Sequence, residues 1–266
     1  ATSAPAAAAS RAPAGDAVLQ TRDVRREYDG VLAVAGVSIS VQRGRLTGLI
    51  GPNGAGKSTL LSMLAGTVAP SGGQILYDGR DITRRAPFRR ARMGLVRTFQ
   101  LSSEFKRLTV LENLLAAVKD HPGDRLGGAL LGRRHWGPAE RQSIERARDL
   151  LDRFRLTRQE NEYAGALSGG QRRLVEIMRA LMAEPRVLLL DEPMAGVHPH
   201  LAAEIGEHLL GLRDQGITIL MVEHELTIVD RLCDPVIALA EGRVIAEGTM
   251  SALRQHREVV EAYLVG

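Results

Sequence analysis

The clearest pattern of hydrophobic and polar positions lies in residues 167–192, which read LSGGQRRLVEIMRALMAEPRVLLLDE. Its hydrophobic side chains recur at the spacing of one face of an α-helix, and they are Leu174, Val175, Ile177, Met178, Leu181 and Met182. Pro185 interrupts the helical pattern, and residues 187–190 are all hydrophobic, which is typical of a strand covered on both faces. The pattern predicts a helix followed by a buried strand.

Both ends of this segment carry residues suited to binding charged ligands. Ser168 is a good helix N-cap, and Gly169 and Gly170 let backbone N–H groups come close to an anion. Asp191 and Glu192 follow the strand, at the end where parallel α/β sheets present their ligand-binding residues. A capped glycine turn and an acidic strand end, one helix apart, indicate a protein that handles phosphate.

The same kinds of pattern predict the other elements. Runs of β-branched and hydrophobic residues predict strands at residues 18–24, 37–41, 46–50, 74–77, 94–100, 217–222, 236–239 and 244–246. Helical spacing predicts helices at residues 59–65, 110–118, 139–154, 198–216, 250–255 and 258–264. Thr109 is expected to cap the second helix, and residues 121–138, rich in Gly, Arg and Pro, are expected to form a loop.

Length and composition fit a globular protein of one large domain or two small ones. The chain has 266 residues, 44% of them hydrophobic and 25% charged, and no hydrophobic run approaches the roughly 18 residues of a membrane span. Residues 1–17 are rich in Ala, Pro and Ser without a continuous hydrophobic stretch, so we expect a disordered tail and not a secretory signal. Cys233 is the single cysteine, which excludes an internal disulfide and suits a reducing, cytoplasmic compartment.

Much of the net charge of +4 is local. Six arginines occur without an acidic residue between them, and they are Arg84, Arg85, Arg89, Arg90, Arg92 and Arg97. A solvated helix face is the plain interpretation, and an anionic membrane surface or a nucleic acid is the alternative. Aromatic residues make up only 3% of the chain, which leaves few side chains for base stacking. We therefore expect no nucleic-acid partner.

Residues 51–59, GPNGAGKST, carry the most specific chemistry. They match the P-loop pattern G-x-x-x-x-G-K-[ST] in full, and they are Gly51, Pro52, Asn53, Gly54, Ala55, Gly56, Lys57, Ser58 and Thr59. The glycines permit a loop whose backbone N–H groups wrap nucleotide phosphates. Lys57 would neutralise the β- and γ-phosphates, and Ser58 would offer its hydroxyl to Mg²⁺. The strand expected before the loop and the helix after it are the context that nucleotide binding requires.

With four further motifs, this loop makes the chain resemble the ATP-binding subunit of an ATP-binding-cassette (ABC) transporter. The further motifs are Gln100, the signature LSGGQ (Leu167, Ser168, Gly169, Gly170 and Gln171), the strand end Asp191–Glu192, and His224. The resemblance covers residues 18–266 and implies an α/β fold of the P-loop NTPase type. It implies a RecA-like core, an antiparallel β subdomain, and an α-helical subdomain at about residues 101–166.

The resemblance also implies ATP and Mg²⁺ as cofactors and assigns residues to them. Tyr28 would stack on adenine. Ser58, Asp191 and Gln100 would hold the Mg²⁺, directly or through water. These residues would supply the positioning and charge stabilisation that phosphoryl transfer needs.

Three residues are implied in hydrolysis. Glu192 would polarise the attacking water, His224 would contact the γ-phosphate, and Gln100 would reach the attacking water and report on the membrane partner. The signature residues, Ser168, Gly169, Gly170 and Gln171, would close over the ATP of a second subunit, so nucleotide binding would drive dimer closure.

The segments VRTFQ, DEPMAGVHP and VVEAYLVG look like the ATPases of branched-chain amino acid importers. Related branches handle urea or short amides, and another extracts lipopolysaccharide. The resemblance implies permease subunits, a second ATP-binding subunit in a homo- or heterodimer, and indirectly a solute-binding protein, at the cytoplasmic face of the plasma membrane. His198 departs from the family pattern, because many ABC proteins have aspartate there and this branch usually has asparagine.

Two other function classes fit the sequence less well. ABC ATPases of DNA repair or translation usually carry long coiled-coil insertions or a second cassette, whereas only residues 101–166 lie between Gln100 and Leu167 here. A GTPase or a small-molecule kinase lacks support, because the guanine-binding pattern N-K-x-D does not occur. An ABC importer ATPase is therefore the expected function.

Overall fold

The computed structural model describes residues 16–98, 106–119 and 133–265. The chain divides into two compact units, a first unit of residues 1–86 and 218–266 and a second unit of residues 87–217, each described by itself. Gln100 and residues 1–15 of the expected tail lie outside the described residues. None of the helices in the described ranges combines the length and the hydrophobicity needed to cross a bilayer.

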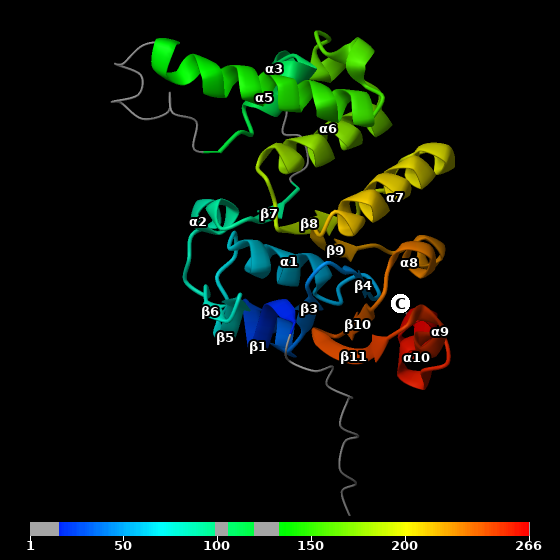
Figure 1. Cartoon of the computed structure of the whole chain (residues 1–266). Helices are drawn as coiled ribbons and strands as arrows, with labels where there is room; N and C mark the ends of the chain where they lie inside the picture. Colours follow the sequence, from blue (N-terminus) through cyan, green and yellow to red (C-terminus); the bar gives the residue numbers. More distant parts are fainter. Residues whose placement is uncertain (1–15, 99–105, 120–132, 266) are drawn as a thin grey trace, which may run out of the picture. The chain divides into compact units, whose positions relative to one another are not determined.

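The first unit contains an antiparallel sheet (Figure 1). Its strands, in the spatial order β2-β1-β5-β6 with β3 also paired to β1, are β1 (Ala17–Tyr28), β2 (Val31–Val37), β3 (Ser40–Gln42), β5 (Gly72–Tyr77) and β6 (Arg80–Asp81). The expected single strand at residues 37–41 is wrong, because β2 already ends at Val37. Asp29 and Gly30 both have positive φ, 47° and 84°, which is the type I′ turn that joins twisted antiparallel strands.

The first unit also contains four further strands, three of them parallel, in the order β11-β10-β4-β9. They are β4 (Leu46–Ile50), β9 (Thr218–Val222), β10 (Val236–Ala240) and β11 (Arg243–Gly248), with β10, β4 and β9 parallel and β11 antiparallel to β10. Every residue of β4 and β9 is buried. The helices of this unit are α1 (Lys57–Ala65), α8 (Leu226–Leu232), α9 (Met250–Leu253) and α10 (Arg257–Val265).

The second unit is mostly helical. Its elements are α2 (Pro87–Arg92), β7 (Leu95–Arg97), α3 (Val110–Leu115), α5 (Arg133–Arg153), the 3-10 turns η3 (Thr157–Gln159) and η4 (Ala164–Ala166), α6 (Gly169–Met182), β8 (Val187–Asp191) and α7 (Pro199–Asp214). β7 and β8 pair in parallel. The loop expected to extend to Pro138 is wrong at its end, because α5 begins at Arg133 and includes Pro138.

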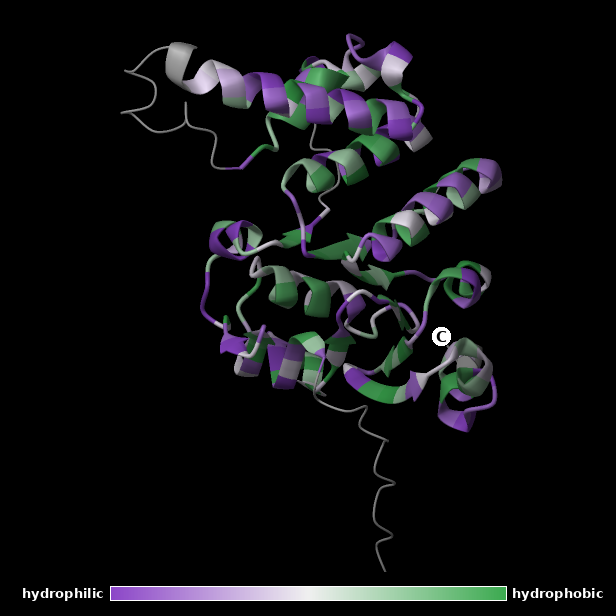
Figure 2. Cartoon of the chain, in the orientation of Figure 1, coloured by the Kyte–Doolittle hydropathy of each residue, from purple (hydrophilic) through white to green (hydrophobic). Residues whose placement is uncertain are grey.

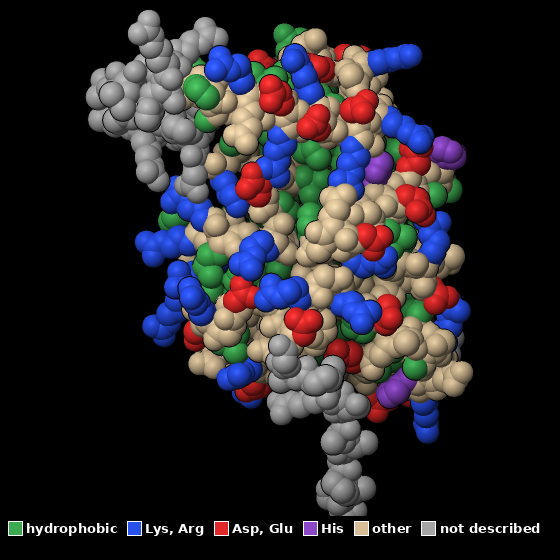
Figure 3. Space-filling model, in the orientation of Figure 1, with side chains coloured by type: hydrophobic (Ala, Val, Ile, Leu, Met, Phe, Trp, Pro, Cys, Tyr) green, Lys and Arg blue, Asp and Glu red, His purple; other side chains and the backbone are tan. Residues whose placement is uncertain are grey.

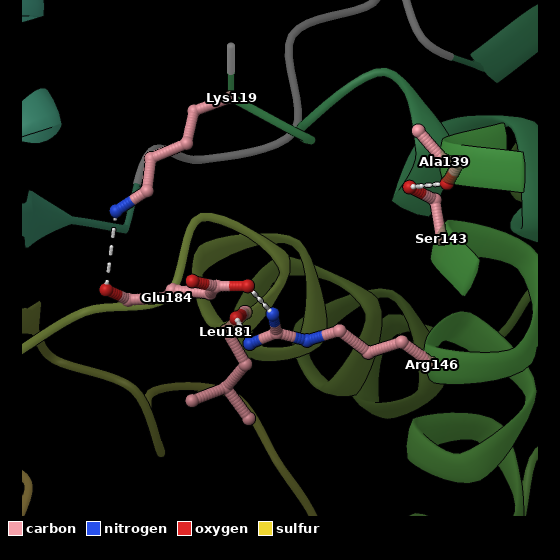
Figure 4. A network of polar contacts seen from close by, with 6 residues as sticks. All are labelled: Lys119, Ala139, Ser143, Arg146, Leu181 and Glu184. Atoms are coloured by element: carbon pink, nitrogen blue, oxygen red, sulfur yellow. Dashed lines mark hydrogen bonds and ion pairs between the residues drawn. The ribbon is translucent and has the colours of Figure 1, made fainter. Parts of the chain in front are cut away.

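Hydrophobic packing and polar contacts join α3, α5 and α6, which contact one another. The hydrophobic face predicted for α6 is buried, and Figure 2 shows hydrophobic residues on α6 and polar residues along α5. Arg146 of α5 donates to Leu181 O near the end of α6 at 2.9 Å and pairs with Glu184 (Figure 4). The arginine is a further donor to a carbonyl near the C-terminal end of the helix, which also accepts from Glu184 N at 3.0 Å. Thr109 caps α3 in a capping box with Glu112, as expected.

The arginine-rich segment is not one solvated face. Lys and Arg side chains gather in Figure 3 where Figure 1 places α2, and Arg89 and Arg92 are exposed there around the exposed ring of Phe88. Arg90, on the same helix, is buried. Arg97 is largely buried and ion-paired. The plain interpretation therefore holds for only part of the segment.

Candidate functional site

The P-loop is packed closely against its neighbours in the first unit. Gly51 has φ 153°, and a Cβ there would lie 2.1 Å from Leu239 O. Gly56 has φ 94°, and a Cβ there would lie 2.3 Å from Ala33 O. Because a side chain at either position would collide with backbone, the loop requires glycine to keep this shape. Asn53 and Gly54 are exposed, so the tip of the loop is accessible to a ligand.

The lysine of the loop points back into it. Lys57 is only 7% exposed, and its ammonium donates to Gly51 O at 2.7 Å and to Pro52 O at 2.9 Å. Lys57 also opens α1, a helix of nine residues, and the hydroxyl-bearing Ser58 is exposed beside it. A buried ammonium next to the positive end of a helix favours a bound anion. The loop therefore provides surroundings that favour an anion such as phosphate.

Tyr28 closes the β1–β2 hairpin opposite Val31 and is 40% exposed. The guanidinium of Arg26 lies 4.4 Å from the centre of its ring, within cation–π distance. The next part of β2 reaches the P-loop, since Ala33 O lies against Gly56. The hairpin thus presents an exposed aromatic ring from a strand that is packed on the P-loop.

His224 lies at the same edge of the sheet as the P-loop. Leu49 of β4 pairs in register with Val222 of β9, so both strands run out toward this edge. The chain reaches Gly51 two residues after Leu49 and His224 two residues after Val222. Parallel strands present their ligand-binding residues at this end. The side chain of His224 is 60% exposed, and its Nδ1 lies 4.0 Å from Oε2 of the buried Glu223.

Three side chains of the first unit were given no site role by sequence reasoning. Glu223 is buried, and an isolated glutamate beside a histidine gives no sequence signal. Burial, with the charge of Glu223 as a lesser cause, raises the pKa of the Cys233 thiol to about 12. Burial also raises the pKa of Tyr263 in α10, while the backbone of Gly51 opposes that rise.

In the second unit, Asp191 ends β8 and Glu192 follows it, as the sequence predicted. Glu192 has φ 46°, a left-handed conformation that is uncommon for a residue with a side chain. Its carbonyl accepts a hydrogen bond from Ala195 N at 3.1 Å. Strained backbone of this kind persists where the surrounding structure fixes it, and it concentrates at functional sites.

Asp191 has a partner that the sequence did not reveal. Nη2 of Arg97, the last residue of β7, lies 2.8 Å from Oδ2 of Asp191. The two residues are far apart in the sequence, and only the parallel pairing of β7 with β8 brings them together. No local sequence pattern could have found this contact.

The signature residues form the beginning of α6. Ser168 is its N-cap, and a capping box joins it to Gln171, with Gln171 N donating to Ser168 Oγ at 3.2 Å and Ser168 N to Gln171 Oε1 at 2.9 Å. Gly169 and Gly170 are the first residues of the helix, and Ser168 and Gly169 are exposed. The predicted cap is confirmed. An exposed, capped helix start with two glycines presents backbone N–H groups to an anion.

His198, which departs from the family pattern, is the N-cap of α7. Its Nδ1 accepts a hydrogen bond from His200 N at 3.4 Å, and Pro199 occupies the first helical position. Aspartate and asparagine are preferred N-caps because their side-chain oxygens accept from the same N–H groups. The imidazole therefore takes over the capping contact that the usual residue would make.

The site residues thus form two sets, one in each unit. The P-loop, Tyr28 and His224 belong to the first unit, and the signature, Asp191 and Glu192 belong to the second. Gln100 was predicted to bind the metal and the attacking water, and it lies outside the described residues. Within each set, the residues lie at or next to the ends of helices and strands.

Comparison with known proteins gives one consistent family. The family model described as ABC transporter matches residues 34–195. A probable branched-chain amino acid transport ATP-binding protein LivG of Archaeoglobus fulgidus is 38% identical over 93% of this chain and 95% of its own length. The high-affinity branched-chain amino acid transport ATP-binding protein BraF of Pseudomonas aeruginosa is 36% identical over 93% of this chain and 97% of its own.

A solved structure is similar over the same range. It is the ADP conformation of an ATP-binding cassette of an ABC transporter, with a TM-score of 0.81 and 38% sequence identity. The match covers 93% of this chain and 98% of that chain. The predicted P-loop NTPase fold of ABC type is confirmed by this likeness.

The cap of α7 gives a prediction about stability. Replacing His198 by alanine should lower the free energy of unfolding by about 1 kcal/mol, because the N–H of His200 loses its acceptor. His198→Asn should keep the stability of the parent chain, since its side-chain oxygen can accept instead. Chemical denaturation at pH 8 measures both, with His200→Ala as a control that leaves the backbone N–H in place. Equal stability of the alanine and asparagine variants would contradict the capping role.

Proposed function

Since the chain belongs to the ABC transporter family and is an ABC-type ATPase, we propose that it powers an importer of branched-chain or other hydrophobic amino acids. The observation that carries this proposal is the match to branched-chain amino acid transport ATP-binding proteins over nearly the whole length of both chains. The geometry of the two sets of site residues supports the ATPase part of the proposal.

Binding of ATP would rest on the first unit. The backbone N–H groups of the P-loop and the start of α1 would hold the phosphates. The ammonium of Lys57, held by two carbonyls at the loop, would exchange these contacts for charge-assisted hydrogen bonds to the β- and γ-phosphates. Tyr28, backed by Arg26, would stack on the adenine ring.

The residues proposed to hold Mg²⁺ fit that ion. Ser58 offers a hydroxyl and Asp191 a carboxylate, and Mg²⁺ prefers such oxygen ligands together with nucleotide phosphates. Ser58 is exposed in the first turn of α1, and Asp191 is only partly buried at the end of β8. Gln100 is proposed as a further ligand. When bound, Mg²⁺ would neutralise charge that develops on the phosphates.

Hydrolysis would use Glu192 and His224. Glu192 would accept a proton from the attacking water, and its left-handed backbone would fix the direction of the carboxylate. His224, at the sheet edge where the P-loop begins, would contact the γ-phosphate. Gln100 would orient the same water. These residues position the reactants and stabilise charge, which are the main requirements of phosphoryl transfer.

We further propose that residues 18–266 act as one cassette, with a helical subdomain at about residues 101–166. The exposed signature at the start of α6 would complete the nucleotide site of a second ATP-binding subunit. Permease subunits would hold the pair at the cytoplasmic face of the membrane, with a solute-binding protein as an indirect partner. The exposure of Ser168 and Gly169 at the start of α6 supports this arrangement, because their backbone groups are accessible to a ligand.

The catalytic assignment predicts different effects for two variants. Glu192→Gln should bind ATP with little change and hydrolyse it about 10²–10⁴-fold more slowly, which is the usual contribution of a general base. Lys57→Ala should weaken ATP binding itself, because it removes the charge that meets the phosphates. Equilibrium binding of a fluorescent ATP analogue and steady-state phosphate release measure the two effects. Unchanged ATP turnover by the Glu192→Gln variant would contradict the role of Glu192 as general base.

The transport assignment predicts which proteins bind the chain. The Glu192→Gln variant with ATP should capture two hydrophobic permeases and a second ATP-binding subunit from membranes of the source organism, identified by mass spectrometry. Lys57→Ala is the matched control, and it should capture less of the second ATP-binding subunit. Recovery of ribosomal or DNA-repair proteins without permeases would contradict the transport function and leave the ATPase chemistry intact.

A further inference from the structure

One charged contact in the second unit joins a proposed metal ligand to a side chain with no assigned role. Arg97 donates from Nη2 to Asp191 Oδ2 at 2.8 Å, and the exposed fractions of the two side chains are 14% and 24%. Strand pairing holds both residues in place, since Arg97 lies opposite Leu189 and Thr98 N donates to Leu189 O at 3.0 Å. The pair is therefore built into the sheet and is not a chance contact of flexible surface side chains.

Arg97 brings a positive charge to the carboxylate. Mg²⁺ bound at Asp191 would bring two more positive charges to the same carboxylate. At this partly buried position, repulsion between the guanidinium and the metal is screened less than it would be at the surface. The guanidinium and the metal therefore oppose each other.

We propose that Arg97 is a positioning residue that competes with Mg²⁺ for Asp191. It holds the carboxylate at the end of β8 and weakens its attraction for a metal ion, so that Mg²⁺ binds firmly only when nucleotide phosphates supply further ligands. This inference rests on the proposed role of Asp191 as a metal ligand. Arg97, on the strand that precedes Gln100, would then be one of the residues that set the affinity for Mg²⁺.

The test measures how strongly Mg²⁺ and nucleotide help each other to bind. The quantity is the ratio of the dissociation constants of a fluorescent ATP analogue in EDTA and in saturating Mg²⁺, which requires no hydrolysis. Arg97→Met keeps most of the hydrophobic stem and removes the charge, and we expect it to raise this ratio about tenfold. Arg97→Lys, which keeps the charge, should stay within about twofold of the parent chain.

Two controls separate this effect from general changes. Arg89→Met removes the same charge from an exposed position on α2 and should leave the ratio unchanged. Unfolding in EDTA tests the contact itself, because a double-mutant cycle of Arg97→Met and Asp191→Asn should be non-additive if the side chains interact. Additive changes in the free energy of unfolding would overturn the contact, and the inference with it.

Asp191→Asn distinguishes a failed inference from a failed function. We expect this variant to bring the ratio close to one, which would support Asp191 as a metal ligand. If it does so while Arg97→Met leaves the ratio unchanged or lowers it, the competition is refuted and the proposed function stands. If Asp191→Asn leaves the ratio at the parent value, the metal role of Asp191 fails, and the inference about Arg97 fails with it.

Discussion

The close packing of the P-loop backbone is the constraint on which the phosphate site depends. Carbonyl groups of Leu239 in β10 and Ala33 in β2 stand so near Gly51 and Gly56 that no Cβ fits at either glycine. The loop is held further by Gly242 N, which donates to Ala55 O at 3.2 Å. A backbone clamped on both sides can present N–H groups to an anion without reorganising, which is the physical basis of tight phosphate binding.

In each unit, the carboxyl ends of parallel strands position the other site residues. In the first unit, the register of β4 with β9 brings His224 to the edge where the P-loop begins. In the second unit, the register of β7 with β8 places Arg97 within 2.8 Å of Asp191. Both arrangements follow from parallel pairing, since parallel strands end side by side. Strand register therefore determines which charged side chains meet.

The sequence predicted the parts of the site that are encoded locally. The P-loop, the Ser168 cap and the buried strand before Asp191 follow from spacing and from residue type, and the structure has the loop, cap and strand at those positions. The β1–β2 hairpin was missed, although Asp29-Gly30 is a strong turn signal between hydrophobic runs. The start of α5 was missed because the Gly-, Arg- and Pro-rich composition of residues 121–138 favoured a loop. Arg97 could not be found locally, because its partner lies on another strand.

ATP-driven uptake by the reconstituted transporter tests the central claim most directly. The chain would be purified with its captured permeases and second ATP-binding subunit, placed in proteoliposomes with the cognate solute-binding protein, and supplied with radiolabelled leucine and ATP. We expect leucine accumulation that requires ATP and is lost when Glu192 is replaced by glutamine. ATP hydrolysis by the same assembly without accumulation of leucine, isoleucine or valine would contradict it.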